Sequence, residues 1–275
     1  MIRRIEGWFV RTFSICAVIF GLSALRVDML TWQTVELASS LGGEKVLSTD
    51  ASARIVNRGN TWTAVGYCRR DYLLAAGRIA AAAVDGVIAA GDIDRVAAAL
   101  DLLERTAQAI LNCSPAESIA WTWVAMARSQ LGGNDEYVER LLARSQWTAP
   151  SDLAVISIRL PEIARNLSRR GDLFAPLARA DIRTLFAAEH SAWDTARILG
   201  PVFAWIGPIA QEEFRSITDA LHRDALIQSL GYQRANIVGC TRERFIDWLY
   251  RGQRGTCDTG DRIPDFDWSK SDQGK

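Results

Sequence analysis

An extended helical pattern constrains the fold of this chain more than any other feature. From Tyr67 to about Tyr232, apolar residues recur at helical spacing, and no segment shows a convincing strand series. Apolar residues at period 3.6 predict amphipathic helices, whereas half-buried strands alternate at period 2. The sequence therefore predicts an all-α domain over residues 67–235. Its expected helices cover residues 67–90, 92–112, 115–131, 134–147, 151–168, 171–189, 191–206 and 208–230.

Turn and cap residues set the expected boundaries of these helices. Ser114 precedes Pro115, and this order predicts an N-cap followed by the first helical residue. Gly171 is expected to end one helix, and Asp172 to cap the next. Pro161 has no backbone N–H to donate, so it is expected to split its helix into two short ones.

The segments on either side of this domain are less regular. Residues 28–66 are interpreted as a linker with one short helix over residues 30–41, because residues 44–65 are largely polar. Residues 236–275 are expected to hold one more helix, over residues 241–250, followed by a flexible tail rich in Gly, Asp and Ser.

A faint repeat is present within the helical domain. The tripeptides Cys-Ser-Pro at 113–115 and Thr-Ala-Pro at 148–150 lie 35 residues apart, and each closes a helix pair of similar length. Such a period, with aromatic and small residues on the first helix, is typical of tetratricopeptide repeats. The Leu-Gly-x-x-Tyr of the first repeat helix is absent, and two units are visible. The sequence therefore predicts an array of α-hairpins with degenerate tetratricopeptide-like character.

The N-terminal segment, residues 1–27, has the layout of a membrane anchor or an export signal. Three arginines come before an uncharged run over residues 12–25. A basic flank before an apolar run predicts that the N-terminus stays in the cytoplasm. We interpret residues 8–25 as a membrane-spanning segment, with a cleaved signal peptide and a buried soluble helix as alternatives. The expected location is the inner membrane, with a single pass and a periplasmic C-terminal domain.

Four cysteines follow this segment, Cys68, Cys113, Cys240 and Cys257, and an even number in an exported chain permits disulfides. Their spacing suggests the pairs Cys68–Cys113 and Cys240–Cys257, with buried free thiols as the alternative. Cys68 begins one predicted helix and Cys113 ends the next. An antiparallel hairpin would bring their Cα atoms to the ~4.4–6.8 Å that a disulfide requires. The sequence contains no Cys-x-x-Cys or Cys/His cluster, so no zinc site is predicted.

Charge and motif content narrow the class of function. The 32 basic and 32 acidic residues give a net charge of zero, and no basic stripe predicts a nucleic-acid partner. The two histidines, His190 and His222, are interpreted as helix-end or surface residues, because no G-x-S-x-G motif or oriented serine accompanies them. No phosphate-binding glycine motif is present. No catalytic residue, metal or cofactor is therefore predicted.

Tryptophans supply the candidate interaction residues. Trp121 and Trp123 lie two positions apart, so they cannot share one face of a helix. Trp123 is expected in the core, on a stripe with Ile119, Ala127 and Leu131. Trp121 falls with Val124 on a more polar stripe. Because exposed tryptophans often contact partners, Trp121 and Trp147 are the candidates. In the alternative interpretation, Trp121 and Trp123 are both buried between hairpins.

The stretch from Asn112 to Trp121 is followed by a Trp- and Ala-rich helix and by Trp147-Thr-Ala-Pro. It resembles a group of uncharacterised alphaproteobacterial membrane-anchored proteins with tetratricopeptide-like helices. The matching elements are Cys113 and Pro115, Ala120 and Trp121, and Ala149 and Pro150. That group is associated with genes for surface-polysaccharide export and polymerisation, which implies a role beside such an assembly. The resemblance carries no catalytic residue over to this chain.

Two hypotheses about function follow from these features. In the first, the chain is a non-catalytic scaffold, held in the membrane by residues 8–25, that recruits other envelope proteins. In the second, it is an envelope enzyme acting on glycans, which would need carboxylates and aromatic residues gathered on a concave surface. The anchor, the hairpins and the lack of a catalytic motif favour the scaffold.

Overall fold

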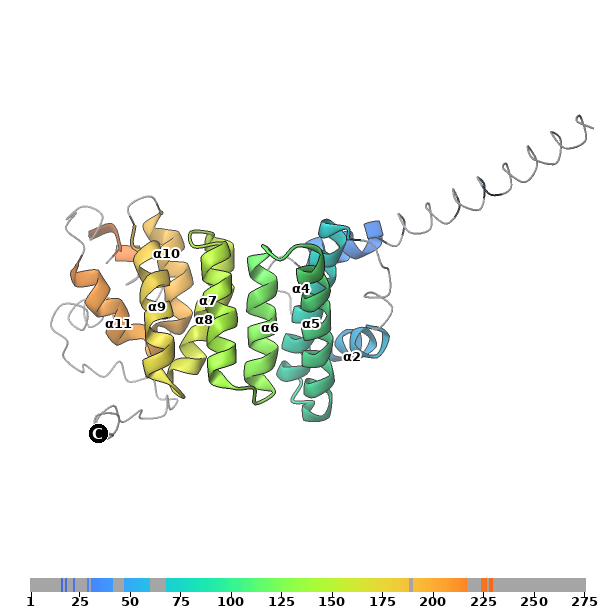
Figure 1. Cartoon of the computed structure of the whole chain (residues 1–275), viewed down its shortest axis with the longest axis horizontal. Helices are drawn as coiled ribbons and strands as arrows, with labels where there is room; N and C mark the ends of the chain where they lie inside the picture. Colours follow the sequence, from blue (N-terminus) through green and yellow to red (C-terminus); the bar gives the residue numbers. More distant parts are fainter. Residues whose placement is uncertain are drawn as a thin grey trace, which may run out of the picture. The chain divides into compact units, whose positions relative to one another are not determined.

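The computed structural model consists of two compact units, Met1–Asn134 and Asp135–Lys275, and each is considered by itself. The described part of the chain contains α-helices, one short 3-10 helix and no β-strand, which confirms the predicted all-α class (Figure 1). The residues that the structure describes are 16, 18, 22, 29, 31–41, 47–59, 68–187, 190–216, 224–226 and 228–229.

The first unit is built around an antiparallel helix pair. Helix α4 (Arg70–Ala89) packs along α5 (Ile93–Cys113), and α5 also packs against α6 (Ser118–Gln130). Helix α2 (Thr49–Arg58) lies against both α4 and α5. Residues 31–40 are helical as well, in agreement with the short helix predicted there.

Small side chains let the helices of the first unit approach closely. The buried face of α4 contains Ala75, Ala76, Ala80 and Ala83. A Cβ atom added to Gly77 would overlap the Trp123 ring, so the indole of α6 lies directly on the α4 backbone. Because alanine has the highest helix propensity and little bulk, this composition favours both the helices and their tight packing.

Helix α4 is also the one described helix that is long and apolar enough to cross a membrane. However, 61% of its most apolar 18-residue stretch is buried inside the protein, as expected for a core helix. Most of the membrane segment predicted at residues 8–25 lies outside the described residues, so that assignment stays a prediction.

The second unit contains the remaining described helices. Helix α7 (Asp135–Thr148) packs on α8 (Leu153–Leu167) and on α9 (Gly171–Leu185), and α8 and α9 form the most extensive helix pair of this unit. Helix α10 (Ala192–Leu199) continues through a short 3-10 helix, Gly200–Val202. Helix α11 (Phe203–Arg215) follows and packs on α8 and α9.

Two of the predicted helix breaks are wrong. Helix α8 passes through Pro161 without a break, because Ile156, Leu160 and Ile163 are all fully buried and hold it against its neighbours. Tertiary packing of an apolar face thus outweighs the hydrogen bond that proline removes. The predicted break between residues 206 and 208 is also absent, since α11 contains Pro208 in its interior. The boundary between α10 and α11 lies earlier in the chain, at the 3-10 helix Gly200–Val202.

The predicted linker over residues 44–65 contains helix α2. Ser48 caps this helix by accepting a hydrogen bond from the Ala51 backbone N–H, and Ile55 and Ser52 are buried. The segment is too polar to show a clear helical pattern in the sequence. Its single buried isoleucine and the cap still suffice once α4 and α5 are beside it.

One predicted helix start is displaced, and two predicted N-caps are wrong. Ser114 does not cap α6, because residues 114–117 form a turn in which the Glu117 N–H donates to the Ser114 carbonyl, and the helix begins only at Ser118. The Pro115 carbonyl in this turn accepts a 2.8 Å hydrogen bond from the Trp121 indole. Helix α9 begins at Gly171, as predicted for the helix over residues 171–189, but Arg170 and not Asp172 occupies its N-cap position. Among the described residues, the glycines with left-handed backbone are Gly91 and Gly132, with φ angles of 68° and 77°, and both lie in turns between helices.

Candidate functional site

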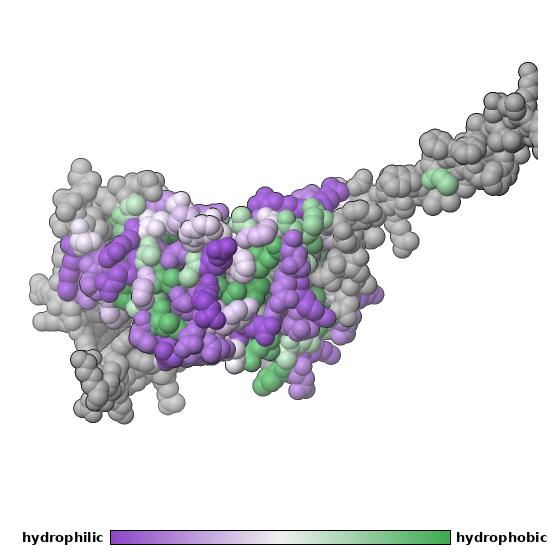
Figure 2. Space-filling model, in the orientation of Figure 1, coloured by the Kyte–Doolittle hydropathy of each residue, from purple (hydrophilic) through white to green (hydrophobic). Residues whose placement is uncertain are grey.

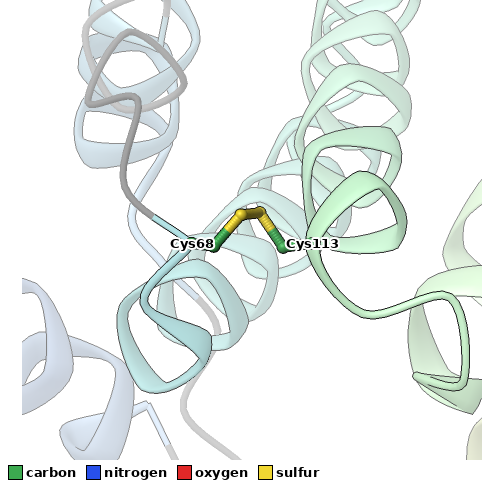
Figure 3. The surroundings of a disulfide bond; sticks show 2 residues. All are labelled: Cys68 and Cys113. Carbon is green, nitrogen blue, oxygen red and sulfur yellow. A yellow bond between two sulfur atoms is a disulfide. The ribbon is translucent and has the colours of Figure 1, made fainter.

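A disulfide joins the two ends of the α4–α5 hairpin (Figure 3). Cys68 lies just before α4 and Cys113 is the last residue of α5, and their Cα atoms are 5.3 Å apart. This confirms the first predicted pair and excludes free thiols at these two positions. Cys240 and Cys257 lie outside the described residues, so their pairing stays a prediction.

The two neighbouring tryptophans of α6 differ in burial as predicted. Trp123 is 2% exposed and belongs to the core, whereas Trp121 is half-buried and its indole N–H is bound to the Pro115 carbonyl. The assignment of their stripes is wrong in detail, because Val124 is buried and Leu131 is exposed. Helix α6 is buried on more than one face, so a single apolar stripe does not describe it.

The other candidate, Trp147, is the most exposed of the large hydrophobic residues in the described part of the second unit. Its side chain is 72% exposed on the last turn of α7, where the Arg144 guanidinium lies 4.8 Å from the centre of its ring. On the face shown in Figure 2, hydrophilic side chains cover much of the described helices and hydrophobic ones appear between them. An indole this accessible is available to a partner.

The core of the second unit contains a charged network that sequence reasoning missed. Arg159 and Asp181 are both fully buried, and the guanidinium donates two hydrogen bonds to the carboxylate, at 2.9 and 2.6 Å. Arg159 also donates to the Ser145 hydroxyl and to the Ala149 carbonyl. Gln146 donates to Asp181 at 2.7 Å. These partners join α7, α8 and α9, so the network is a structural crosslink between three helices.

A signal for this network exists in the sequence. Arg159 lies on the same helical face as Ile156, Leu160 and Ile163, all of which are buried. A single charge inside an apolar stripe predicts a buried group with a specific partner, because an unpaired buried charge is very costly. The identity of the partner, Asp181, cannot be derived from the pattern, since it lies on another helix.

A pocket of about 550 Å³ lies between the α8–α9 turn and α11. Trp205, which is 49% exposed, lines this pocket together with Arg170 and Asp172. Hydrogen bonds from the Arg170 guanidinium hold the pKa of Asp172 below its usual range. Asp172 is therefore ionised at neutral pH and is not suited to donate a proton. Further lining residues are Leu167, Arg169, Ala175, Pro208 and Ile209.

Metal ligands do not gather in the described part of the chain. No group of three or more His, Cys, Asp or Glu side chains able to hold a metal ion occurs among these residues. His190 follows α9 in a short connection to α10, and His222 lies outside the described residues. The described side chains offer two candidate surfaces for recognition: the exposed Trp147 on α7 and the pocket lined by Trp205.

Comparison with known proteins found no protein-family model, no curated protein and no solved structure that matches this chain.

Proposed function

We propose that this chain is a membrane-anchored helical scaffold whose exported domain binds other proteins of the bacterial envelope. The observation that carries the proposal is the Cys68–Cys113 disulfide. Disulfides persist in oxidising compartments such as the periplasm and are rare in the cytosol. Together with the three arginines that precede residues 12–25, the disulfide supports an N-terminus in the cytoplasm and a periplasmic domain.

The interaction part of the proposal is supported by the described surface. Each unit contains a pair of packed helices joined by a short connection, α4–α5 in the first and α8–α9 in the second, and such hairpins are compatible with a degenerate tetratricopeptide-like array. Trp147 is exposed on α7, and tryptophan and arginine are enriched among residues that dominate protein interfaces. By the resemblance of residues 112–150 to the alphaproteobacterial group, the partners belong to an assembly that makes or exports surface polysaccharide.

The location and the interaction are tested separately. A C-terminal alkaline phosphatase fusion to the full chain should be active, and a green fluorescent protein fusion at the same position should be dark. The reverse pattern contradicts the periplasmic location. In-cell crosslinking of the full chain, followed by detergent extraction, should yield discrete heteromeric products. A chain that is recovered only as a monomer contradicts the scaffold.

The Trp205 pocket favours glycan recognition as a second candidate function. An indole face beside a guanidinium and a carboxylate suits a ligand that has an apolar ring face and both hydrogen-bond donors and acceptors. Glycoside hydrolysis usually requires a second carboxylate and a protonated acid. Asp172 is the one carboxylate among the lining residues of this pocket, and its lowered pKa keeps it ionised. The pocket therefore favours binding of a saccharide over its cleavage. Titration of the full chain with neutral oligosaccharides, with Trp205→Ala as the control, tests this candidate.

A further inference from the structure

The outer face of α7 carries aromatic and arginine side chains in one line. Tyr137, Arg140, Arg144 and Trp147 are all exposed, and their spacing of three, four and three residues places them on one stripe of the helix. We call these four residues the α7 stripe. It faces away from the core of the second unit, because the buried residues of α7 occupy another arc: Val138, Leu141, Leu142 and Ser145.

Each arginine of the α7 stripe lies over an aromatic ring. The Arg140 guanidinium is 5.9 Å from the centre of the Tyr137 ring, and that of Arg144 is 4.8 Å from the centre of the Trp147 ring. Both distances are within the range of cation–π attraction. The contacts restrict two long side chains that would otherwise move freely, so less conformational entropy is lost when a partner binds.

The positive charge of the α7 stripe is not matched within the described part of the chain. No described carboxylate forms an ion pair with Arg140 or Arg144, and both side chains are exposed. The acidic residues of α7 are confined to its first half, where they complement the helix dipole; they are Asp135, Glu136 and Glu139. The second half therefore presents two guanidinium groups beside an exposed indole.

Resting on the proposed function, we propose that the α7 stripe docks an acidic amphipathic helix of a partner protein. Arg140 and Arg144 are one helical turn apart, with a rise of about 6 Å between them. Two carboxylates four residues apart on a partner helix have the same rise, so each can form a charge-assisted pair with one arginine. Apolar side chains three residues outside the carboxylates then meet Tyr137 and Trp147. The matching pattern is apolar-x-x-Glu-x-x-x-Glu-x-x-apolar.

Other occupants fit the α7 stripe less well. A second copy of the chain, docked through the same stripe, would place arginines against arginines, and such like-charge contacts oppose association. An anionic membrane surface would meet the whole helix, including Asp135, Glu136 and Glu139, which outnumber the two arginines. A helix of a partner protein can bind along Arg140, Arg144 and Trp147 and so meet, of these acidic residues, only Glu136, which lies one turn before Arg140.

The test uses the full chain in detergent micelles and a fluorescein-labelled 18-residue synthetic helix that carries this pattern with leucine as the apolar residue. Two comparison peptides keep the host sequence: one moves both glutamates to the opposite face, and one replaces them with lysine. Fluorescence anisotropy should show that the matched peptide binds at least tenfold more tightly than either. Equal binding of the matched and displaced peptides overturns the proposal.

Variants of the protein locate the binding. Arg140→Glu/Arg144→Glu should weaken binding of the matched peptide at least tenfold, and Trp147→Ala at least fivefold. The control Arg78→Glu/Arg215→Glu reverses two exposed arginines elsewhere and makes the same change in net charge, so it should alter affinity by less than twofold. An equal loss in the control, or displacement of the peptide by phosphatidylglycerol vesicles, contradicts an α7 site for a protein helix. Peptide binding is independent of the fusion assay, so the two proposals fail separately.

Discussion

The two units of this chain hold their helices together by different means. In the first unit, α4 and α5 meet through small side chains and are joined by the Cys68–Cys113 disulfide. In the second unit, α7, α8 and α9 meet around a buried charge pair, Arg159 and Asp181. The first arrangement relies on close packing and a covalent bond, the second on a hydrogen-bonded network in the core.

This difference implies that the stability of the two units depends on different conditions. A disulfide contributes only where the compartment keeps it oxidised, so the first unit is sensitive to redox conditions. The Arg159–Asp181 pair does not depend on redox conditions, but loss of one partner leaves a buried, uncompensated charge. A reductant should therefore destabilise only the first unit, and a mutation of Arg159 or Asp181 only the second.

The largest effect is expected from Asp181→Ala. Removal of this carboxylate leaves the fully buried Arg159 without its charge partner, which typically costs about 3–5 kcal/mol. Urea unfolding of the full chain should show this loss in the second unit. The double variant Arg159→Met/Asp181→Leu should recover most of the stability, because apolar replacement of both partners is often neutral. A double variant as unstable as Asp181→Ala would mean that packing, not charge, explains the loss.

Trp123→Ala is expected to have the largest effect in the first unit. The indole is buried against Gly77, and truncation of a buried aromatic residue costs about 3–5 kcal/mol. Trp121→Ala removes a half-buried side chain and one hydrogen bond, so it should cost less than Trp123→Ala. Comparison of the two variants by chemical denaturation checks the ranking. Equal losses would show that both tryptophans act as core residues and would exclude Trp121 as an interaction candidate.

Removal of the disulfide should have a somewhat smaller effect. The two cysteines are separated by 45 positions, and a disulfide typically contributes about 2–4 kcal/mol, with the chain-entropy model placing a loop of this length near the upper end. Cys68→Ser/Cys113→Ser should lose that amount, and a reductant should then have no further effect on the unfolding of the first unit. Cys16→Ser, which changes an exposed free cysteine, is the matched control and should leave unfolding unchanged. A double variant as stable as the native chain would contradict the role given to the disulfide.

The smallest effect concerns Asp172. Its pKa is lowered in the folded state by hydrogen bonds from Arg170, so its contribution to stability is present above the unfolded-state pKa of about 3.9. The contribution is lost as the pH falls through the folded-state pKa. Because this ion pair is exposed, Asp172→Asn should destabilise the chain only slightly at pH 7, and the difference should vanish in acid. A stability difference between the native chain and Asp172→Asn that grows as the pH falls would contradict the lowered pKa of Asp172.

Some features of the fold follow from sequence patterns and others do not. The all-α class and the first disulfide were predictable, because helical periodicity is local and the ends of an antiparallel hairpin must meet. Helix α2 and the continuation of α8 through Pro161 were not, since both depend on packing against other helices. The charge of Arg159 is visible in the sequence, but Asp181 can be identified as its partner only in three dimensions.

The candidate sites show the same limit. Trp147 was predicted as an interaction candidate from its residue type, and the structure finds it exposed. The alignment of Tyr137, Arg140 and Arg144 with it follows from helical spacing once the bounds of α7 are known. The Trp205 pocket combines residues from the α8–α9 turn and from α11, which are distant in the sequence.

Hydrogen exchange of the full chain in detergent, measured by mass spectrometry with and without a reductant, tests the comparison of the two units most directly. Reduction should accelerate amide exchange in α4 and α5 and leave α8 and α9 unchanged. Asp181→Ala should accelerate exchange in α8 and α9 and leave the α4–α5 pair unchanged. If either perturbation accelerates exchange equally in all four helices, the two units do not rest on separate stabilising features.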